Sequence, residues 1–214
     1  MIEVNGLEVP RSLDELLDPR RVALIVYDMQ VGITRQIGDR DRVLQQVRRV
    51  LDSARQARVR TFFTRHMSLP KELMGSMQYR TAMAWQHTDD PTRIKSPFLR
   101  GSANFAIEPE LQPLDSEAVF DKITMSAFEG TPLAIALRDC GVRAVVVVGI
   151  ALEIGIEPTA RHAADLGFVP ILVRDACGHG NAEAAERSWR SLEFSGDSIV
   201  SDATRVCTAW SNQR

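Results

Sequence analysis

The sequence has few cysteines, no long apolar run and no excess of basic residues, and each of these absences excludes a class of protein. The cysteines, Cys140, Cys177 and Cys207, are three in number, far apart and without a CxxC pair. This excludes a disulfide framework and a zinc knuckle. The longest apolar run lies around residues 144–150, well below the roughly 20 residues of a membrane span.

The charge balance also limits the partners that we expect. Lys plus Arg number 26 and Asp plus Glu number 28, for a net charge of −2. Nucleic acids and anionic membranes bind surfaces with a clear basic excess, so neither is an expected partner. The first residues are acidic where a signal peptide is basic and then apolar, so we expect a cytoplasmic location.

The order of apolar segments predicts one α/β domain over residues 1–214. Short β-branched runs alternate with helical periods along the chain. The predicted strands are 22–27, 59–63, 118–120, 144–148, 168–173 and 197–200, and the predicted helices are 43–57, 132–139, 156–166 and 182–193. Such alternation is typical of a doubly wound, three-layer αβα sandwich around a mostly parallel sheet.

In such a sheet the ligand binds beyond the carboxyl ends of the strands. The residues that follow the predicted strands are 28–30, 64–66, 121–122, 149–152 and 174–177, and these are the candidates for chemistry. Asp28 is suited to acid–base work, although a helix cap or a turn is an alternative role. Lys122 is either a surface lysine or an ammonium that pairs with Asp28.

A long segment, 64–117, interrupts the alternation and carries several prolines. Within it, residues 71–86 are compatible with a helix that bears Met74, Met77, Met83 and Trp85. Two interpretations stay open: a helix packed on the core, or a lid or oligomer contact built from adaptable apolar side chains.

Three separated motifs together resemble the isochorismatase-like, or cysteine hydrolase, superfamily. They are ALIVYDMQ at 23–30, DKITMSAF at 121–128 and VGIALEIGIEPTARHAADL at 148–166. The resemblance covers about residues 20–205 and implies a six-stranded parallel sheet. It also implies a catalytic Asp–Lys–Cys triad, in which Asp28 and Lys122 match the first two members.

Gly155 stands where the resemblance places the nucleophilic cysteine. A glycine has no side chain with which to attack, so a covalent intermediate at this position is excluded. A branch of the superfamily that hydrolyses the vinyl ether isochorismate also has glycine here. The resemblance then implies that a protonated Asp28 donates to the vinyl carbon, while Lys122 stabilises the carboxylate that forms. A structural role for Gly155, in close backbone approach, is the alternative.

The same resemblance suggests the substrate-binding residues. It places a cis peptide near Ala151–Leu152, with amide N–H groups directed at the substrate, although many members have Thr where this chain has Leu152. Arg65 and Arg80 have the fork geometry that binds a carboxylate, and solvated surface arginines are the alternative. The full set of expected substrate-binding residues is Gln30, Arg65, Gln78, Arg80, Phe128, Ala151 and Leu152.

We expect no metal and no cofactor. The four histidines show no ligand spacing, and the stretch Thr64–His66 lacks the carboxylate with which some relatives bind a metal. Cys177 follows a predicted strand and is a candidate for a displaced nucleophile, although a small buried residue is the simpler interpretation.

Three functional hypotheses remain. The first is a cysteine-independent hydrolase of a small carboxylated substrate such as isochorismate. The second is an amidohydrolase that uses Cys177 or an activated water, and the third is a catalytically silent homologue that binds a small ligand. The resemblance also implies a homodimer or a higher homo-oligomer.

Overall fold

The computed structural model describes residues 1–213, which form a six-stranded parallel sheet between two layers of helices. The strands lie in the order β5-β4-β3-β6-β7-β8. Their bounds are β3 Val22–Tyr27, β4 Arg60–His66, β5 Ala118–Lys122, β6 Ala144–Ile150, β7 Val169–Gly178 and β8 Ile199–Ser201. This confirms the predicted αβα architecture.

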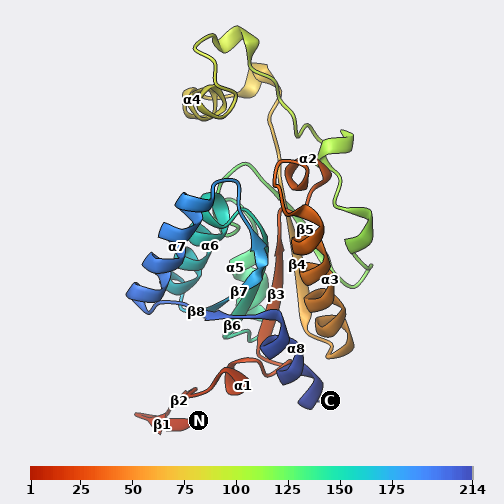
Figure 1. The fold of residues 1–214 in the computed structure, drawn as a ribbon. Helices are drawn as coiled ribbons and strands as arrows, with labels where there is room; N and C mark the ends of the chain where they lie inside the picture. The colour runs from red at the N-terminus through yellow and green to blue at the C-terminus, as the bar shows by residue number, and fades with distance from the viewer. Residues whose placement is uncertain (214) are drawn as a thin grey trace.

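Helices cover both faces of the sheet (Figure 1). On one face lie α3 (Arg40–Gln56) and α8 (Ala203–Asn212), and on the other lie α5 (Leu133–Asp139), α6 (Glu157–Asp165) and α7 (Ala182–Ser195). The side chains of β3 alternate between them: Leu24 and Val26 join the core under α3, whereas Ile25 and Tyr27 join the core under α6. A strand buried on both faces is apolar throughout, as β3 is.

The topological switch point lies between β3 and β6. From β3 the chain moves outward to β4 and β5 and then returns to β6 on the other side of β3. Gly149 of β6 pairs with Tyr27 and has a φ of 130°; a Cβ atom there would lie 2.9 Å from Tyr27 N. Glycine therefore permits the close approach of these strands at the point where their connections diverge, which is where α/β sheets bind ligands.

Several strands extend further than the sequence predicts. β4, β5 and β7 run on to His66, Lys122 and Gly178. Their polar last residues stay in the sheet because backbone pairing continues, as between Arg65 and Asp121. The candidate residues at these ends therefore belong to strands and are held rigidly.

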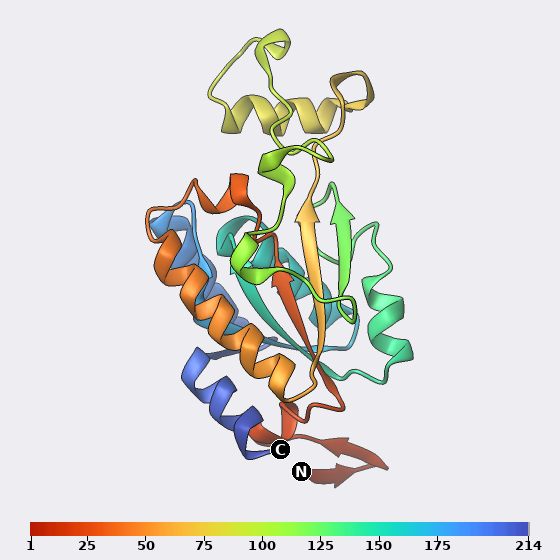
Figure 2. The same ribbon diagram turned by 90° about the vertical axis from the view of Figure 1, so that its right-hand side faces the viewer.

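A long arm, residues 67–100, stands beyond the carboxyl ends of the strands (Figures 1 and 2). It contains α4 (Ser76–Trp85), which lies within the helix expected at 71–86, and two short 3₁₀ turns, Lys71–Leu73 and Pro91–Arg93. Further 3₁₀ turns at Ala103–Phe105 and Pro109–Leu111 lead back to β5. No residue of α4 is buried, so the expectation of a helix packed on the core is wrong for the chain as described.

Some elements have no counterpart in the predicted set. These are the antiparallel hairpin of β1 (Ile2–Val4) and β2 (Leu7–Val9), the short helices α1 (Leu13–Leu16) and α2 (Val31–Thr34), and α8. No helix in residues 1–213 is both long and apolar enough to span a membrane.

Candidate active site

A buried ion pair lies at the switch point. Asp28 directly follows β3 and adopts a left-handed backbone conformation, with a φ of 47°. This conformation is uncommon outside glycine and tends to occur at functional sites. The Asp28 Oδ2 atom accepts a hydrogen bond from Lys122 Nζ at 2.6 Å, and Oδ1 accepts one from the Thr64 hydroxyl at 2.6 Å. The Asp28 carboxyl group is thus fixed by β4 and β5, two neighbouring strands of its own sheet.

Lys122 reaches Asp28 from the end of β5, across β4. Its side chain is completely buried. Its ammonium donates to Asp28, to Tyr27 Oη at 2.9 Å and to the Thr124 carbonyl at 3.1 Å. Three acceptors match the three donors of a charged ammonium group, so the buried charge is both paired and fully hydrogen-bonded.

Gly155 lies next to the phenol of Tyr27, which Lys122 contacts. It belongs to a π-helical turn, Leu152–Ile156, between β6 and α6. The cis peptide bond near it joins Ile150 to Ala151, one residue earlier than the expected position at Ala151–Leu152. Ala151 lines the cavity beside Gly155, whereas Leu152 is buried in the core under α6 and is absent from the lining as described for residues 1–213.

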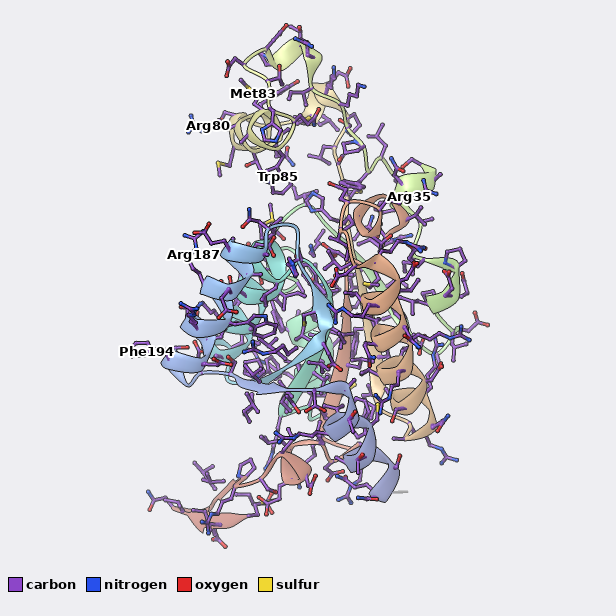
Figure 3. All side chains as sticks on the ribbon, viewed as in Figure 1. Arg35, Arg80, Met83, Trp85, Arg187 and Phe194 are labelled. Atoms are coloured by element: carbon purple, nitrogen blue, oxygen red, sulfur yellow. The ribbon has the colours of Figure 1, made fainter. Side chains whose placement is uncertain are left out.

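A cavity of about 560 Å³ connects these groups. Its floor includes Tyr27, Asp28, Ala151 and Gly155, and its roof includes Ala84, Trp85 and His87 from the arm. In Figure 3 the Trp85 side chain lies between α4 and the body of the molecule. The volume suits a small-molecule ligand, and the lining is largely apolar with a few polar groups.

The cavity carries little positive charge. Among residues 1–213, no Lys or Arg side chain lines it, whereas the acidic Glu153 does. The Glu153 Oε1 atom accepts hydrogen bonds from the backbone N–H groups of Gly180 and Asn181, both at 2.8 Å. Its Oε2 atom is buried and has no hydrogen-bond partner within the described residues. Burial lowers the pKa of His66, another lining residue, which favours its neutral form.

The structure brings together only part of the expected set of site residues. Asp28, Ala151 and Gly155 line the cavity, and Lys122 lies directly behind Asp28. Gln30 is buried and holds the ends of β3 and β4 together: its side chain accepts from His66 N at 2.6 Å and donates to His66 O at 3.0 Å. Phe128 is buried against Phe168, with the ring centroids 5.9 Å apart.

The expected arginines also lie outside the cavity lining. Arg65 Nε donates to Asp121 Oδ1 at 2.8 Å, and its guanidinium lies 4.2 Å from the ring centroid of Phe105. Arg80 lines a separate shallow hollow with His87, next to the cavity. Gln78 accepts from Gly75 N at 3.1 Å at the start of α4 and faces another hollow of the arm. The side chains of Arg65 and Gln78 therefore bind other residues of the chain, Asp121 and Gly75, and do not line the cavity where substrate binding is expected.

Cys177 is buried in β7, and its Sγ atom lies 3.7 Å from the Val147 carbonyl. Burial raises the pKa of its thiol well above the usual range, so the unreactive neutral form is favoured. It is absent from the cavity lining as described for residues 1–213. Within the same residues, no three His, Cys, Asp or Glu side chains are grouped so that they could share a metal ion.

Tyr27 and Glu153 take part in the site but are not among the candidates, whereas Thr64 and His66 lie in the candidate stretch 64–66 and Trp85 lies in the candidate lid segment, without an expected role in binding substrate. Tyr27 had a usable signal, since it is a phenol at the end of an otherwise apolar strand and directly precedes Asp28. The contribution of Glu153 depends on a loop after β7, which no local pattern links to it.

The fold and this site define a class of protein: a doubly wound α/β protein with an acid–base pair facing a small cavity at its switch point. The chain matches the isochorismatase domain over residues 22–204, and it belongs to that family. Family membership supports a hydrolase.

Named relatives agree with this assignment. An uncharacterized isochorismatase family protein, YecD of Escherichia coli O157:H7, is 31% identical over 80% of this chain and 87% of its own. A ureidoacrylate amidohydrolase, RutB of Rhizobium rhizogenes, is 27% identical over 76% of this chain and 72% of its own. A cysteine hydrolase structure from Pseudomonas syringae has a TM-score of 0.79 at 20% identity, covering 92% of this chain and 95% of that one, and shows the shared fold.

Proposed function

We propose that this hydrolase works without a thiol nucleophile and that Asp28 transfers the proton on which its reaction depends. The observation that carries the proposal is the buried Asp28–Lys122 pair, 2.6 Å apart, which faces the cavity beside a glycine. A positioned carboxyl group contributes to catalysis by exchanging a proton with the reacting atoms. Gly155 offers no side chain for a covalent step.

The most concrete reaction is the hydrolysis of a small vinyl ether such as isochorismate. This reaction needs Asp28 in its protonated form, in place of the ion pair with Lys122. The acid donates its proton to the terminal vinyl carbon, the resulting oxocarbenium ion takes up water, and the proton that this water loses returns to Asp28. The hemiketal then collapses to pyruvate and a dihydroxycyclohexadiene carboxylic acid. The carboxylate left on Asp28 is stabilised by the Lys122 ammonium and the Thr64 hydroxyl, which already contact its two oxygens.

The charge of the cavity favours a second candidate, the hydrolysis of an uncharged amide or ureido group by an activated water. The lining includes Glu153 but, within residues 1–213, no Lys or Arg that could pair with a substrate carboxylate. In this reaction the ionised Asp28 accepts a proton from the attacking water. RutB, a ureidoacrylate amidohydrolase, is a relative whose name points to ureido chemistry.

The test compares both reactions in the full chain. Pyruvate release from isochorismate and ammonia release from a panel of ureido compounds and primary amides are measured with wild type, Asp28→Asn and Asp28→Ala. We expect at least one reaction to proceed and to fall by about 100-fold or more in both variants, the lower end of what a general acid or base contributes. Turnover that is unchanged in Asp28→Ala would contradict the proposal.

Cys177→Ala distinguishes this reaction from one that uses a displaced thiol. Because the Cys177 thiol is buried and its pKa is raised, we expect the variant to keep the wild-type rate and iodoacetamide to leave that rate unchanged. Loss of activity in either experiment would favour a cysteine nucleophile. If no compound is turned over but one raises the melting temperature, the protein is a ligand-binding homologue.

A further inference from the structure

The space in front of Gly155 is filled by the side chain of Tyr27. A Cβ atom built on Gly155 would lie 2.7 Å from Tyr27 Cε1, and closer still to Cζ and to the Oη atom. Heavy atoms that are not bonded do not approach so closely. Position 155 therefore accepts only glycine while Tyr27 keeps its place.

Tyr27 is firmly held in that place. It is the last residue of β3 and is 2% exposed. Its hydroxyl donates to the Met125 carbonyl and accepts from Lys122 Nζ at 2.9 Å. The Lys122 ammonium also lies 4.3 Å from the centroid of the phenol ring. Moving the ring aside would break two buried hydrogen bonds, so the phenol cannot yield at low cost.

Without the phenol, a side chain at 155 would face an activating environment. Tyr27 Oη touches both the position of the missing Cβ and the Lys122 ammonium, so a side chain in its place would contact that ammonium. Position 155 also lies two residues before the first residue of α6, whose N-terminus is the positive end of its dipole. A nearby cation and a helix N-terminus both favour a thiolate.

The phenol itself does not supply a nucleophile. Burial, together with the nearby Asp28 charge, raises the pKa of Tyr27 well above its ordinary value. The group is therefore a neutral phenol at physiological pH, suited to donating and accepting hydrogen bonds.

We propose that Tyr27 determines the reaction class of this site: its phenol occupies the place of a side chain at position 155 and so excludes a nucleophile beside Lys122. Tyr27 and Gly155 then depend on each other: a larger residue at position 155 is tolerated only if a smaller residue replaces Tyr27. This inference rests on the proposed thiol-free reaction and names the residue responsible for it.

The test is a double-mutant cycle with Gly155→Cys and Tyr27→Val. We expect Gly155→Cys alone to lower the melting temperature by about 5 °C or more, or to prevent folding; in a chain of this size a shift of about 5 °C corresponds to a loss of roughly 1.2–2.5 kcal/mol. In a protein that already carries Tyr27→Val, Gly155→Cys should lower the melting temperature by less than half of that amount. Tyr27→Phe is the intermediate control: it keeps the ring carbons that block position 155 but lacks the hydroxyl that lies nearest to it and holds the ring in place, so it should rescue less than Tyr27→Val.

The second readout is the reactivity of the introduced thiol, followed by iodoacetamide labelling at pH 7 and peptide mass spectrometry. In Tyr27→Val/Gly155→Cys we expect the thiol at 155 to react about 10-fold faster than the exposed Cys140. Adding Lys122→Met should remove this acceleration.

The proposal would be overturned if Gly155→Cys had the same stability and the same thiol reactivity with Tyr27 in place as in combination with Tyr27→Val. It would also be overturned if Tyr27→Val did not reduce the loss of melting temperature caused by Gly155→Cys. Neither the melting temperature nor the rate of thiol labelling depends on catalytic activity. If wild type hydrolyses nothing, the proposed function fails, while the cycle still decides whether Tyr27 closes position 155.

Discussion

Both oxygens of the Asp28 carboxyl group accept hydrogen bonds from the protein itself, one from Lys122 and the other from Thr64. Any proton that Asp28 exchanges with a substrate therefore moves within a preformed network. Such preorganisation lets a hydrolase stabilise charge without reorienting its own dipoles during the reaction. Because the same network is buried, a substitution of a residue around Asp28 affects both the stability of the fold and the proton transfer.

His66 provides a pH prediction at this scale. Burial lowers its pKa in the folded protein, whereas the unfolded chain titrates near about 6.5. The unfolded state therefore takes up a proton first as the pH falls. Stability contributed by neutral His66 is full above about pH 6.5 and is lost as the pH falls toward the folded-state pKa, by at most about 1.4 kcal/mol per pH unit.

Urea denaturation of wild type and His66→Gln between pH 7.5 and 5.5 checks this prediction. We expect the free energy of unfolding to fall more steeply in wild type than in the variant. The same slope in both proteins would show that His66 titrates alike in the folded and unfolded chain.

At the scale of elements, α4 of the arm contributes to the cavity but not to the core. α4 has no buried residue as described, yet Trp85 at its end lines the roof of the cavity. An element with few buried apolar contacts adds little to global stability and is free to move with the ligand. That the arm acts as a lid stays a prediction, which its place over the cavity supports.

Trp85→Ala tests the contribution of the arm to binding. We expect the KM for the substrate to rise by about 10-fold, through loss of a large apolar contact, with a change in unfolding free energy within about 0.5 kcal/mol. Met77→Ala is the control, because Met77 is 71% exposed on the same helix and lines a different hollow. Equal effects of both variants on KM would argue against a roof formed by Trp85.

Two of the elements that the sequence analysis missed had local signals. In α8, Ala203, Val206, Ala209 and Trp210 recur at helical spacing, and Asp202 caps the helix by accepting from Arg205 N at 2.9 Å. The first hairpin turns at Asn5 and Gly6, both with positive φ, a dipeptide that favours tight hairpins. Strand ends were harder to predict, because the hydrophobic pattern stops at the polar residues while the backbone pairing continues through them.

At the scale of the whole molecule, assembly into a homodimer or a higher homo-oligomer stays a prediction. The arm projects from the body and carries exposed apolar side chains, with Leu73 at 68% and Met77 at 71% exposure (Figure 2). Exposed apolar groups gathered on one segment are typical of a protein contact.

Light scattering coupled to size-exclusion chromatography measures the state of the chain. We expect a mass of at least twice the 23.8 kDa of one chain, and a shift to the monomer in Leu73→Glu/Met77→Glu. A monomeric wild type at micromolar concentration would contradict this prediction. A wild-type oligomer that the double variant leaves intact would place the contact elsewhere.

The sequence by itself determined the fold class, because buried β-branched strands and amphipathic helices each reveal their burial through local periodicity. It also indicated Asp28 and Lys122, since each follows a predicted strand end and matches a motif, and the family resemblance of the motif at 148–166 indicated Gly155. Only the tertiary structure decided that Tyr27 fills the space at Gly155 and that Arg65 lies outside the cavity lining. These are contacts between residues far apart in the sequence, and they depend on register and packing, which no local pattern encodes.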